Sequence, residues 1–330
     1  MRVVPDFSPP FWLAGGMAQT IWSNYAPRSR SCSELRARAT TLTLDTADEI
    51  YLRVHWNPQD SLATPTVVIF HGLTGRASSP QVLGLAAKAW QAGFTVVRAD
   101  LRNALGDTPS IGVGHAGRSE DADAVLAHVA SERPSSPIAA IGYSLGGNVL
   151  LKALGERLPA AVSVTAAVAI STPIDLDIAC EAIDSPANRV FRNYFVRRMK
   201  RIVAGRAARH EVYRDVELDD VRTVREFDGR LVAPLCGFDS AEDYYARSSA
   251  LRVIDGIATP TLLIQSVDDP FIPFAPFESQ PVGANSQIEL LRTRRGGHCG
   301  FWGRPGADGD RFWAEHRAVE YCAAQLGMSG

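Results

Sequence analysis

The stretch at residues 138–150, IAAIGYSLGGNVL, decides the fold. An apolar run of strand type leads into GYSLG at 142–146, and a run suited to a helix follows. Glycines on both sides of a serine let a strand and a helix approach closely around a sharp turn, so that the hydroxyl stands clear of the sheet. A bare G-x-S-x-G also occurs in loops that merely turn. The strand before it and the helix after it favour Ser144 as a nucleophile.

Patterns on either side of this stretch alternate between strand and helix. Apolar runs typical of buried strands occur at 66–70, 94–99, 161–170, 259–264 and 287–291. Helical spacing of apolar residues appears at 83–90, 121–129 and 310–326. Two alternating runs at 40–45 and 50–56, joined by a polar turn at 46–49, predict a hairpin before them. The sequence therefore predicts an α/β fold: a mostly parallel central sheet with helices on both faces.

One insertion interrupts this predicted core. From 172 to 250 the alternation of strands and helices lapses, and the segment is rich in arginine and aromatic residues. We therefore divide the chain into an N-terminal arm packed on the core at 1–39, a first core part at 40–171, a helical cap at 172–250, and a second core part at 251–330.

Composition narrows the classes of function. A chain of 330 residues that is 46% hydrophobic can bury a large core, and a net charge of -2 gives no general attraction to nucleic acid. The five cysteines show no C-x-x-C pair, which argues against a disulfide framework or a zinc site and favours a reducing cytoplasm. Neither H-E-x-x-H, nor G-x-G-x-x-G, nor a Walker loop occurs, so we expect no metal and no organic cofactor. No apolar segment is long enough to predict a membrane span.

A serine hydroxyl is a weak nucleophile, so it needs a base to take its proton and an acid to hold that base in the right tautomer. The predicted strand at 259–264 leads into SVDDPFIP, and the one at 287–291 leads toward GGHCGF. We predict His298 as the base. Asp269 is preferred to Asp268 as the acid because the sequence DPFIP is typical of the turn after this strand in hydrolases.

The carbonyl under attack needs preorganised donors for its developing negative charge. The backbone N–H of Leu145, directly after the nucleophile and at the positive end of a helix, is one candidate. The N–H of Leu73, in HGLTG after the strand at 66–70, is the second. His71 in this loop and His115 in VGHAGR are either parts of the site or structural residues, and the sequence leaves both readings open.

With these motifs in order, the chain resembles the YheT-like family of α/β-hydrolases, which includes embryogenesis-associated and ABHD-type relatives. The likeness rests on PPFWL with a following QTI, on HGLTG, HAGRSED and GYSLGGNVLLKALGE, on an FD and GFDSAEDYY in the cap, and on DDPF and GGHCGF. It covers nearly the whole chain. The resemblance implies a serine carboxylesterase-type hydrolase in which Ser144, Asp269 and His298 match the family triad.

We accordingly predict hydrolysis of carboxylic esters through an acyl-serine intermediate. Short to medium acyl chains are expected, with lipid-like substrates left open, and aromatic residues of the cap are expected to line the acyl pocket: Phe191, Tyr194, Phe195, Phe238, Tyr244 and Tyr245. An acyltransferase on the same triad and a non-catalytic binding protein of this fold are the alternatives.

The expected partner is a small-molecule ester, without nucleic acid and without stable membrane insertion. The cap stretch around 191–202 combines an apolar stripe with basic flanks, so peripheral contact with a membrane stays open. The sequence does not indicate an oligomeric state.

Overall fold

The computed structural model describes residues 7–45, 51–59, 61–102, 104, 112–156, 162–306 and 309–328. The turn predicted at 46–49 lies outside these ranges, as do Ile50 and Ala161, the first residues of two predicted strands.

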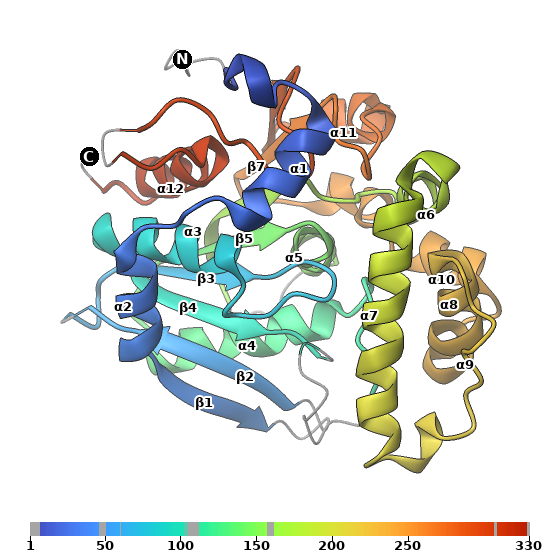
Figure 1. The fold of residues 1–330 in the computed structure, drawn as a ribbon. Helices are drawn as coiled ribbons and strands as arrows, with labels where there is room; N and C mark the ends of the chain where they lie inside the picture. Colours follow the sequence, from blue (N-terminus) through green and yellow to red (C-terminus); the bar gives the residue numbers. More distant parts are fainter. Residues whose placement is uncertain are drawn as a thin grey trace.

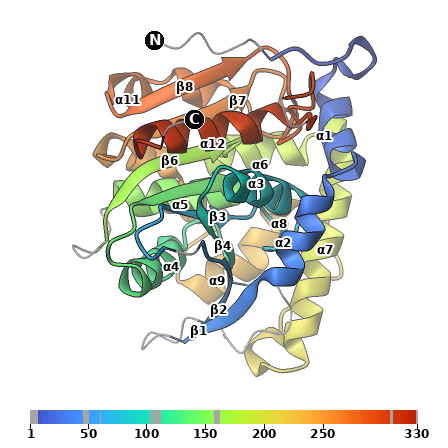
Figure 2. The ribbon, with the colours of Figure 1, turned by 90° about the vertical axis from the view of Figure 1, so that its left-hand side faces the viewer.

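An eight-stranded sheet forms the centre of the described structure (Figures 1 and 2). Its strands are β1 (Thr40–Asp45), β2 (Tyr51–Asn57), β3 (Thr66–Phe70), β4 (Thr95–Asp100), β5 (Ile138–Tyr143), β6 (Val164–Ile170), β7 (Thr261–Ser266) and β8 (Ile288–Thr293). Their spatial order is β1-β2-β4-β3-β5-β6-β7-β8. The predicted hairpin β1–β2 is antiparallel, β2 pairs antiparallel with β4, and every later pairing is parallel. The predicted mostly parallel α/β sheet is confirmed.

Helices cover both faces of the sheet because its central strands are apolar on both sides. Along β3, Val68 and Phe70 belong to one apolar cluster, whereas Val67 and Ile69 belong to another. Successive side chains of a strand point to opposite faces, so an unbroken apolar run needs cover on both. The first cluster is covered by α4 (Ser119–Glu132) and α5 (Leu145–Gly155). The second is covered by α2 (Arg30–Arg38), α3 (Pro80–Gln91) and α12 (Trp313–Gln325).

In chain order, a group of helices follows β6 and precedes β7, where the cap was predicted. It contains α6 (Leu176–Asp184), η2 (Pro186–Asn188), α7 (Arg189–Ala207), η3 (Glu211–Tyr213), α8 (Val224–Phe227), η4 (Asp228–Val232), α9 (Ala233–Cys236), α10 (Ala241–Ser248), η5 (Ala250–Arg252) and η6 (Ile254–Gly256). Its α-helices stand together beside the sheet in Figure 1 and share an apolar cluster of their own. The exact bounds of the cap remain a prediction. The short helices η7 (Ala275–Glu278) and α11 (Gln280–Ala284) follow β7.

The basic helix of the cap is α7, and its apolar side packs inward. Met199, together with Val196 and Val203, is buried in the cap cluster. Some of the basic side chains bind backbone carbonyls: Arg192 NH1 donates to Asp184 O at 2.9 Å, and Arg198 Nε donates to Thr74 O at 3.1 Å. Within the described residues, no helix is both long and apolar enough to cross a membrane.

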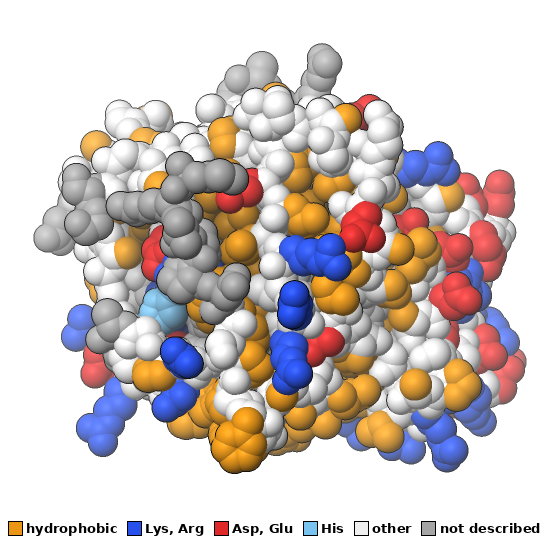
Figure 3. Space-filling model, turned by 90° about the horizontal axis from the view of Figure 1, so that it is seen from above, with side chains coloured by type: hydrophobic (Ala, Val, Ile, Leu, Met, Phe, Trp, Pro, Cys, Tyr) orange, Lys and Arg blue, Asp and Glu red, His pale blue; other side chains and the backbone are white. Residues whose placement is uncertain are grey.

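The N-terminal arm contains helices that the sequence pattern did not reveal, η1 (Phe11–Leu13) and α1 (Gly16–Tyr25) in addition to α2. Tertiary packing holds them, since the rings of Trp12, Trp22 and Trp302 lie 5.6 Å apart pairwise. Figure 3 views the top of the molecule and shows hydrophobic side chains exposed on this face. The buried face of α1 is polar or small (Gly16, Gln19, Thr20 and Ser23), whereas Ile21 and Tyr25 are exposed, so the usual pattern of buried apolar residues does not mark this helix.

Candidate active site

Ser144 occupies a strained turn between β5 and α5. Its backbone has φ 48° and ψ -121°, a conformation unusual for a residue with a side chain. The flanking glycines make the turn sterically feasible: a Cβ on Gly142 would lie 2.5 Å from the Cα of Gly147, and one on Gly146 would lie 2.3 Å from the carbonyl oxygen of His71. The close approach therefore requires the G-x-S-x-G pattern, and it presents the Ser144 hydroxyl at the carboxyl end of the sheet.

The three predicted triad residues lie in hydrogen-bond contact. Nε2 of His298 is 3.0 Å from Ser144 Oγ, and Nδ1 of the same ring is 2.9 Å from Asp269 Oδ2. Because a carboxylate only accepts, Nδ1 carries a proton, and in the neutral ring Nε2 is left to accept from the serine hydroxyl. A serine, an imidazole and a carboxylate in this order form an arrangement suited to nucleophilic attack on a carbonyl.

The two neighbouring aspartates have different partners. Oδ1 of Asp269 accepts hydrogen bonds from the N–H groups of Phe271 at 2.9 Å and Ile272 at 3.0 Å, which fixes the carboxylate facing the ring. Oδ1 of Asp268 instead accepts from the N–H of Gly297 at 2.9 Å. Asp268 therefore holds the loop before His298, while Asp269 orients the imidazole.

Opposing effects act on the pKa of His298. Burial lowers it, whereas the charge and hydrogen bond of Asp269 raise it, and the resulting pKa lies well above the ordinary histidine value. The buried carboxylate thus favours the imidazolium form of the ring.

The predicted oxyanion donors flank the serine. Leu145 is the first residue of α5, so its N–H lies at the positive end of the helix, and in the described part of the chain neither this N–H nor that of Leu73 has a protein acceptor. Gly72 packs directly on Ser144, since a Cβ there would lie 3.1 Å from Ser144 Cβ.

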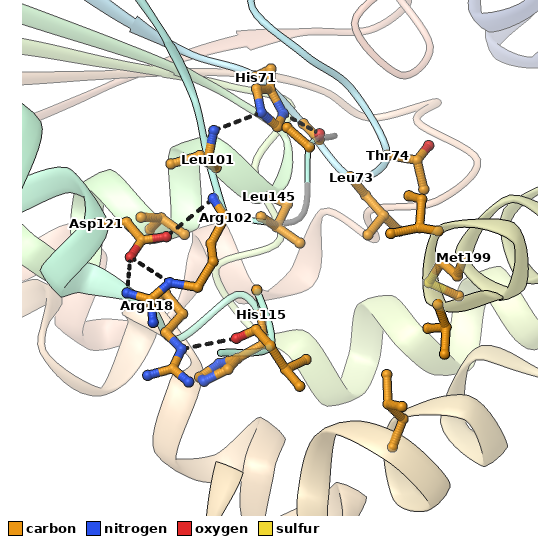
Figure 4. Close-up of a pocket in the computed structure, with 18 of the residues that line it drawn as sticks. His71, Leu73, Thr74, Leu101, Arg102, His115, Arg118, Asp121, Leu145 and Met199 are labelled. Atoms are coloured by element: carbon orange, nitrogen blue, oxygen red, sulfur yellow. Dashed lines mark hydrogen bonds and ion pairs between the residues drawn. The ribbon is translucent and has the colours of Figure 1, made fainter. Parts of the chain in front are cut away.

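His71 orients the peptide between Gly72 and Leu73, as Figure 4 shows. Its Nε2 accepts a hydrogen bond from the N–H of Leu101 at 3.0 Å, so the proton is on Nδ1, which donates to Gly72 O at 2.8 Å. Burial lowers the pKa of His71 and keeps the ring neutral in this role. Because C=O and N–H of a trans peptide point in opposite directions, holding the Gly72 carbonyl on His71 turns the Leu73 N–H away from it. The structure thus supports a structural role for His71, which holds the backbone of this loop.

The loop that carries His298 is held by residues that the sequence reasoning missed. The N–H of His298 donates to Thr20 Oγ1 at 2.8 Å, and Thr20 in turn donates to Gly16 O at 2.8 Å. The N–H of Cys299 donates to Ser171 Oγ, and Ser266 Oγ donates to Gly297 O.

The arm and this loop also meet at Gln19, which is fully buried. Its side chain donates to Trp302 O at 3.0 Å and accepts from Trp302 N at 2.8 Å. The available sequence signal was the QT of the family motif, which does not say what these residues contact.

One cavity opens beside the serine, and a second adjoins it. One, of about 120 Å³, is lined by Ser144 and His298 together with side chains from α6, α7, α8 and α10, and the other, of about 90 Å³, is lined by His71 and Arg102 (Figure 4). Of the cap aromatics expected here, Phe195, Tyr244 and Tyr245 line the first cavity.

Three expected pocket aromatics lie elsewhere. Phe191 packs edge to face on Phe271, Phe238 packs on His115 and Tyr244, and Tyr194 is 53% exposed. Helical spacing alone did not tell which side of α7 faces the cavity.

His115 lines both cavities and is held neutral. Burial lowers its pKa to about 3, with nearby Arg118 acting in the same direction. Its Nδ1 accepts from the N–H of Gly117 at 3.1 Å, so Nε2 carries the hydrogen. Across the described ranges, no three His, Cys, Asp or Glu side chains are grouped as metal ligands would be.

Comparison with known proteins agrees with the fold. Residues 65–305 match the protein-family model described as the alpha/beta hydrolase fold. YheT of Escherichia coli, an esterase candidate by its name, is 32% identical over 86% of this chain and 84% of its own. Phospholipase ABHD3 of Homo sapiens is 27% identical over 95% of this chain and 78% of its own. An esterase of Pyrococcus furiosus matches in structure with a TM-score of 0.59 at 17% identity, over 90% of this chain and 98% of its own, which is a likeness of fold.

The first prediction concerns the titration of His298. Its imidazole should titrate above the ordinary histidine pKa, and Asp269→Asn should move that pKa down because the charge that raises it is removed while burial still lowers it. Histidine resonances followed by NMR across a pH series measure both values. His115 serves as the internal control, since its lowered pKa keeps it neutral throughout. An unchanged His298 pKa in Asp269→Asn would show that Asp269 does not raise it.

The second prediction concerns the clamp from α1. Thr20→Val removes the acceptor of the His298 N–H, and we expect the rate at which a fluorophosphonate labels Ser144 to fall about tenfold, since an unpaired buried donor costs about 1–3 kcal/mol. Thr20→Ser should restore the rate. The matched control is Ser23→Ala, because Ser23 is buried on the same helix and bonds only to Thr20 O. Equal labelling rates for Thr20→Val and Ser23→Ala would contradict the clamp.

Proposed function

The chain belongs to the α/β-hydrolase family, in its YheT-like group, and on that premise we propose that it is a serine hydrolase that cleaves carboxylic esters. The observation that carries the proposal is the position of His298, whose ring nitrogens lie 3.0 Å from Ser144 Oγ and 2.9 Å from Asp269 Oδ2. Relatives named as esterase and phospholipase support hydrolase chemistry.

In the proposed first step, Ser144 Oγ attacks the ester carbonyl while Nε2 of His298 takes the hydroxyl proton. The negative charge that develops on the carbonyl oxygen is stabilised by the N–H groups of Leu73 and Leu145. The imidazolium then gives its proton to the leaving alcohol, and the acyl group stays on Ser144. Asp269 keeps the ring in the productive tautomer and favours its charged form.

In the second step, water attacks the acyl-serine with His298 again as the base, which releases the acid and restores the hydroxyl. An alcohol that took the place of water would make the same site an acyltransferase. The ratio of free acid to new ester formed when an acceptor alcohol is added decides between the two.

The cavity beside Ser144 supports an acyl group as its occupant. Its walls include Phe195, Met199 and Phe271, and each methylene buried against such side chains contributes about 0.8 kcal/mol. A cavity of about 120 Å³ favours short to medium acyl chains over long ones.

The proposal includes a cytoplasmic location. All five cysteines are free, with Cys32, Cys180 and Cys322 buried, and this usage is typical of a reducing compartment.

The third prediction tests the nucleophile. Ser144→Ala should abolish both hydrolysis of p-nitrophenyl esters and covalent labelling by a fluorophosphonate, because no other described hydroxyl lies on His298 Nε2. Peptide mass spectrometry locates the label in the unmodified protein, and a thermal melt checks that the variant is folded. Label found on a different serine, or ester turnover that survives the substitution, would rule out Ser144.

The fourth prediction separates two phenylalanines of α7. Phe195 lines the cavity, whereas Phe191 packs outside it, and both contact Phe271. Phe195→Ala should reduce the preference for octanoate over butyrate esters by about fourfold, the equivalent of one buried methylene. The matched variant Phe191→Ala should retain the preference. The measurement is kcat/KM across an acyl series, and equal profiles for the two variants would show that α7 does not shape the acyl pocket.

A further inference from the structure

Asp228 is the one acid among the described residues that line the cavity beside Ser144. It is 8% exposed and lies on the first turn of η4, a π-helical segment. Single π-helical turns within helical segments are rare and frequently occur at functional sites. A buried carboxylate in an apolar wall is costly unless it has partners, so its partners need to be identified.

One oxygen of this carboxylate is accounted for. The Tyr245 hydroxyl donates to Asp228 Oδ2 at 2.7 Å, and the same hydroxyl lies 3.0 Å from Cys180 Sγ. Arg225, whose charge lowers the pKa of Asp228, is engaged elsewhere: NH1 binds Glu242 at 2.8 Å and NH2 binds Asp177 at 2.5 Å. The carboxylate is therefore oriented by a tyrosine and is not neutralised by a salt bridge.

The other oxygen has no partner in the described structure, and its residue lines the cavity. Oδ1 of Asp228 has no hydrogen-bond partner among the described residues, yet it is not one of the polar atoms sealed off from solvent without a partner. Tyr244, which lines the same cavity, accepts from the N–H of Ala116 at 2.9 Å and keeps its own O–H. An acceptor and a donor thus remain in a cavity whose walls are otherwise mainly apolar.

We propose that Asp228 forms a subsite for a hydroxyl group on the acyl chain, so that the substrates are esters of hydroxylated acids. This inference rests on the proposed esterase function and names the substrate class of that same site. The apolar part of the substrate's acyl chain lies against α6 and α7, and the hydroxyl on that acyl chain donates to Asp228 Oδ1. An unsubstituted chain leaves that oxygen without a partner.

A hydroxyl suits this position better than an ammonium group. Burial raises the pKa of Asp228 to about 7, although the Tyr245 hydrogen bond lowers it. Near neutral pH the carboxyl group is therefore present in both protonation states. A hydroxyl donates to the ionised form and accepts from the protonated form, whereas an ammonium group can bind only the ionised form.

The test compares p-nitrophenyl octanoate with octanoates that carry one hydroxyl near the ester, in the middle of the chain, or at its far end. The wild-type protein should prefer one of the hydroxylated esters in kcat/KM. Asp228→Leu should lower that preference by about tenfold to a hundredfold, the range for a hydrogen bond to a charged group. The kcat/KM for the unsubstituted ester should fall far less. A purely structural role of Asp228 would instead lower kcat/KM for both kinds of ester alike.

Two further variants make the result specific. Asp228→Leu/Tyr245→Phe removes both partners of the buried hydrogen bond and leaves neither unpaired, so it should fold and still lose most of the preference if Asp228→Leu proves unstable. Val232→Ala, on the same helical segment and lining the same cavity, should change chain-length preference and leave the hydroxyl preference intact. No preference for any hydroxylated ester, or an unchanged preference in Asp228→Leu or in Asp228→Leu/Tyr245→Phe, overturns the subsite.

Failure of the proposed function gives a different result. If no ester is hydrolysed, calorimetry measures the Kd of the same esters for Ser144→Ala, which tests the cavity without turnover. A lower Kd for a hydroxylated ester that disappears in Ser144→Ala/Asp228→Leu supports the subsite on its own. Equal Kd values for all the esters overturn it.

Discussion

The close approach of β5 and α5 around Ser144 is the constraint on which the site depends. A side chain at Gly142 or Gly146 would overlap backbone atoms, so the chain at this corner can adopt only a turn that holds the serine at positive φ. The surrounding parallel strands hold the strained turn in place, because β3 and β6 flank β5 and are buried on both faces. The same geometry places the start of α5 and the loop after β3 beside the hydroxyl, and these segments carry the candidate oxyanion amides.

The imidazole is positioned by parts of the chain that are far apart in sequence. Asp269 orients the ring, Asp268 and Ser266 hold the glycines before it, and Thr20 from the N-terminal arm binds its backbone N–H. A loop with glycines at 296, 297 and 300 has little conformational preference of its own, so these external hydrogen bonds supply the order that the loop lacks. The arm is therefore part of the architecture of the site.

The cap combines two roles in one layer. Its outward surface is charged and its basic helix α7 is tied to carbonyls of the cap and core, while its inward surface closes an apolar cavity over the serine. Within that wall, Asp228 and Tyr245 are polar, and their hydrogen bond fixes which carboxylate oxygen is left toward the cavity. Apolar contact there can select for chain size, whereas the single oriented acceptor can select for chemistry.

The sequence by itself determined the α/β fold, the strand boundaries to within a few residues, and the residues Ser144, Asp269 and His298 as candidates, whose catalytic roles stay predictions. These features are local: strand and helix periods, and turn residues such as the glycines around Ser144, are written in neighbouring positions. Tertiary structure alone decided that Thr20 and Gln19 hold the histidine loop, that Phe195 and not Phe191 lines the cavity, and that one oxygen of Asp228 has no partner in the described part of the chain. Each of these depends on which distant segment packs against a side chain. The spacing of residues within one segment carries no information about that neighbour.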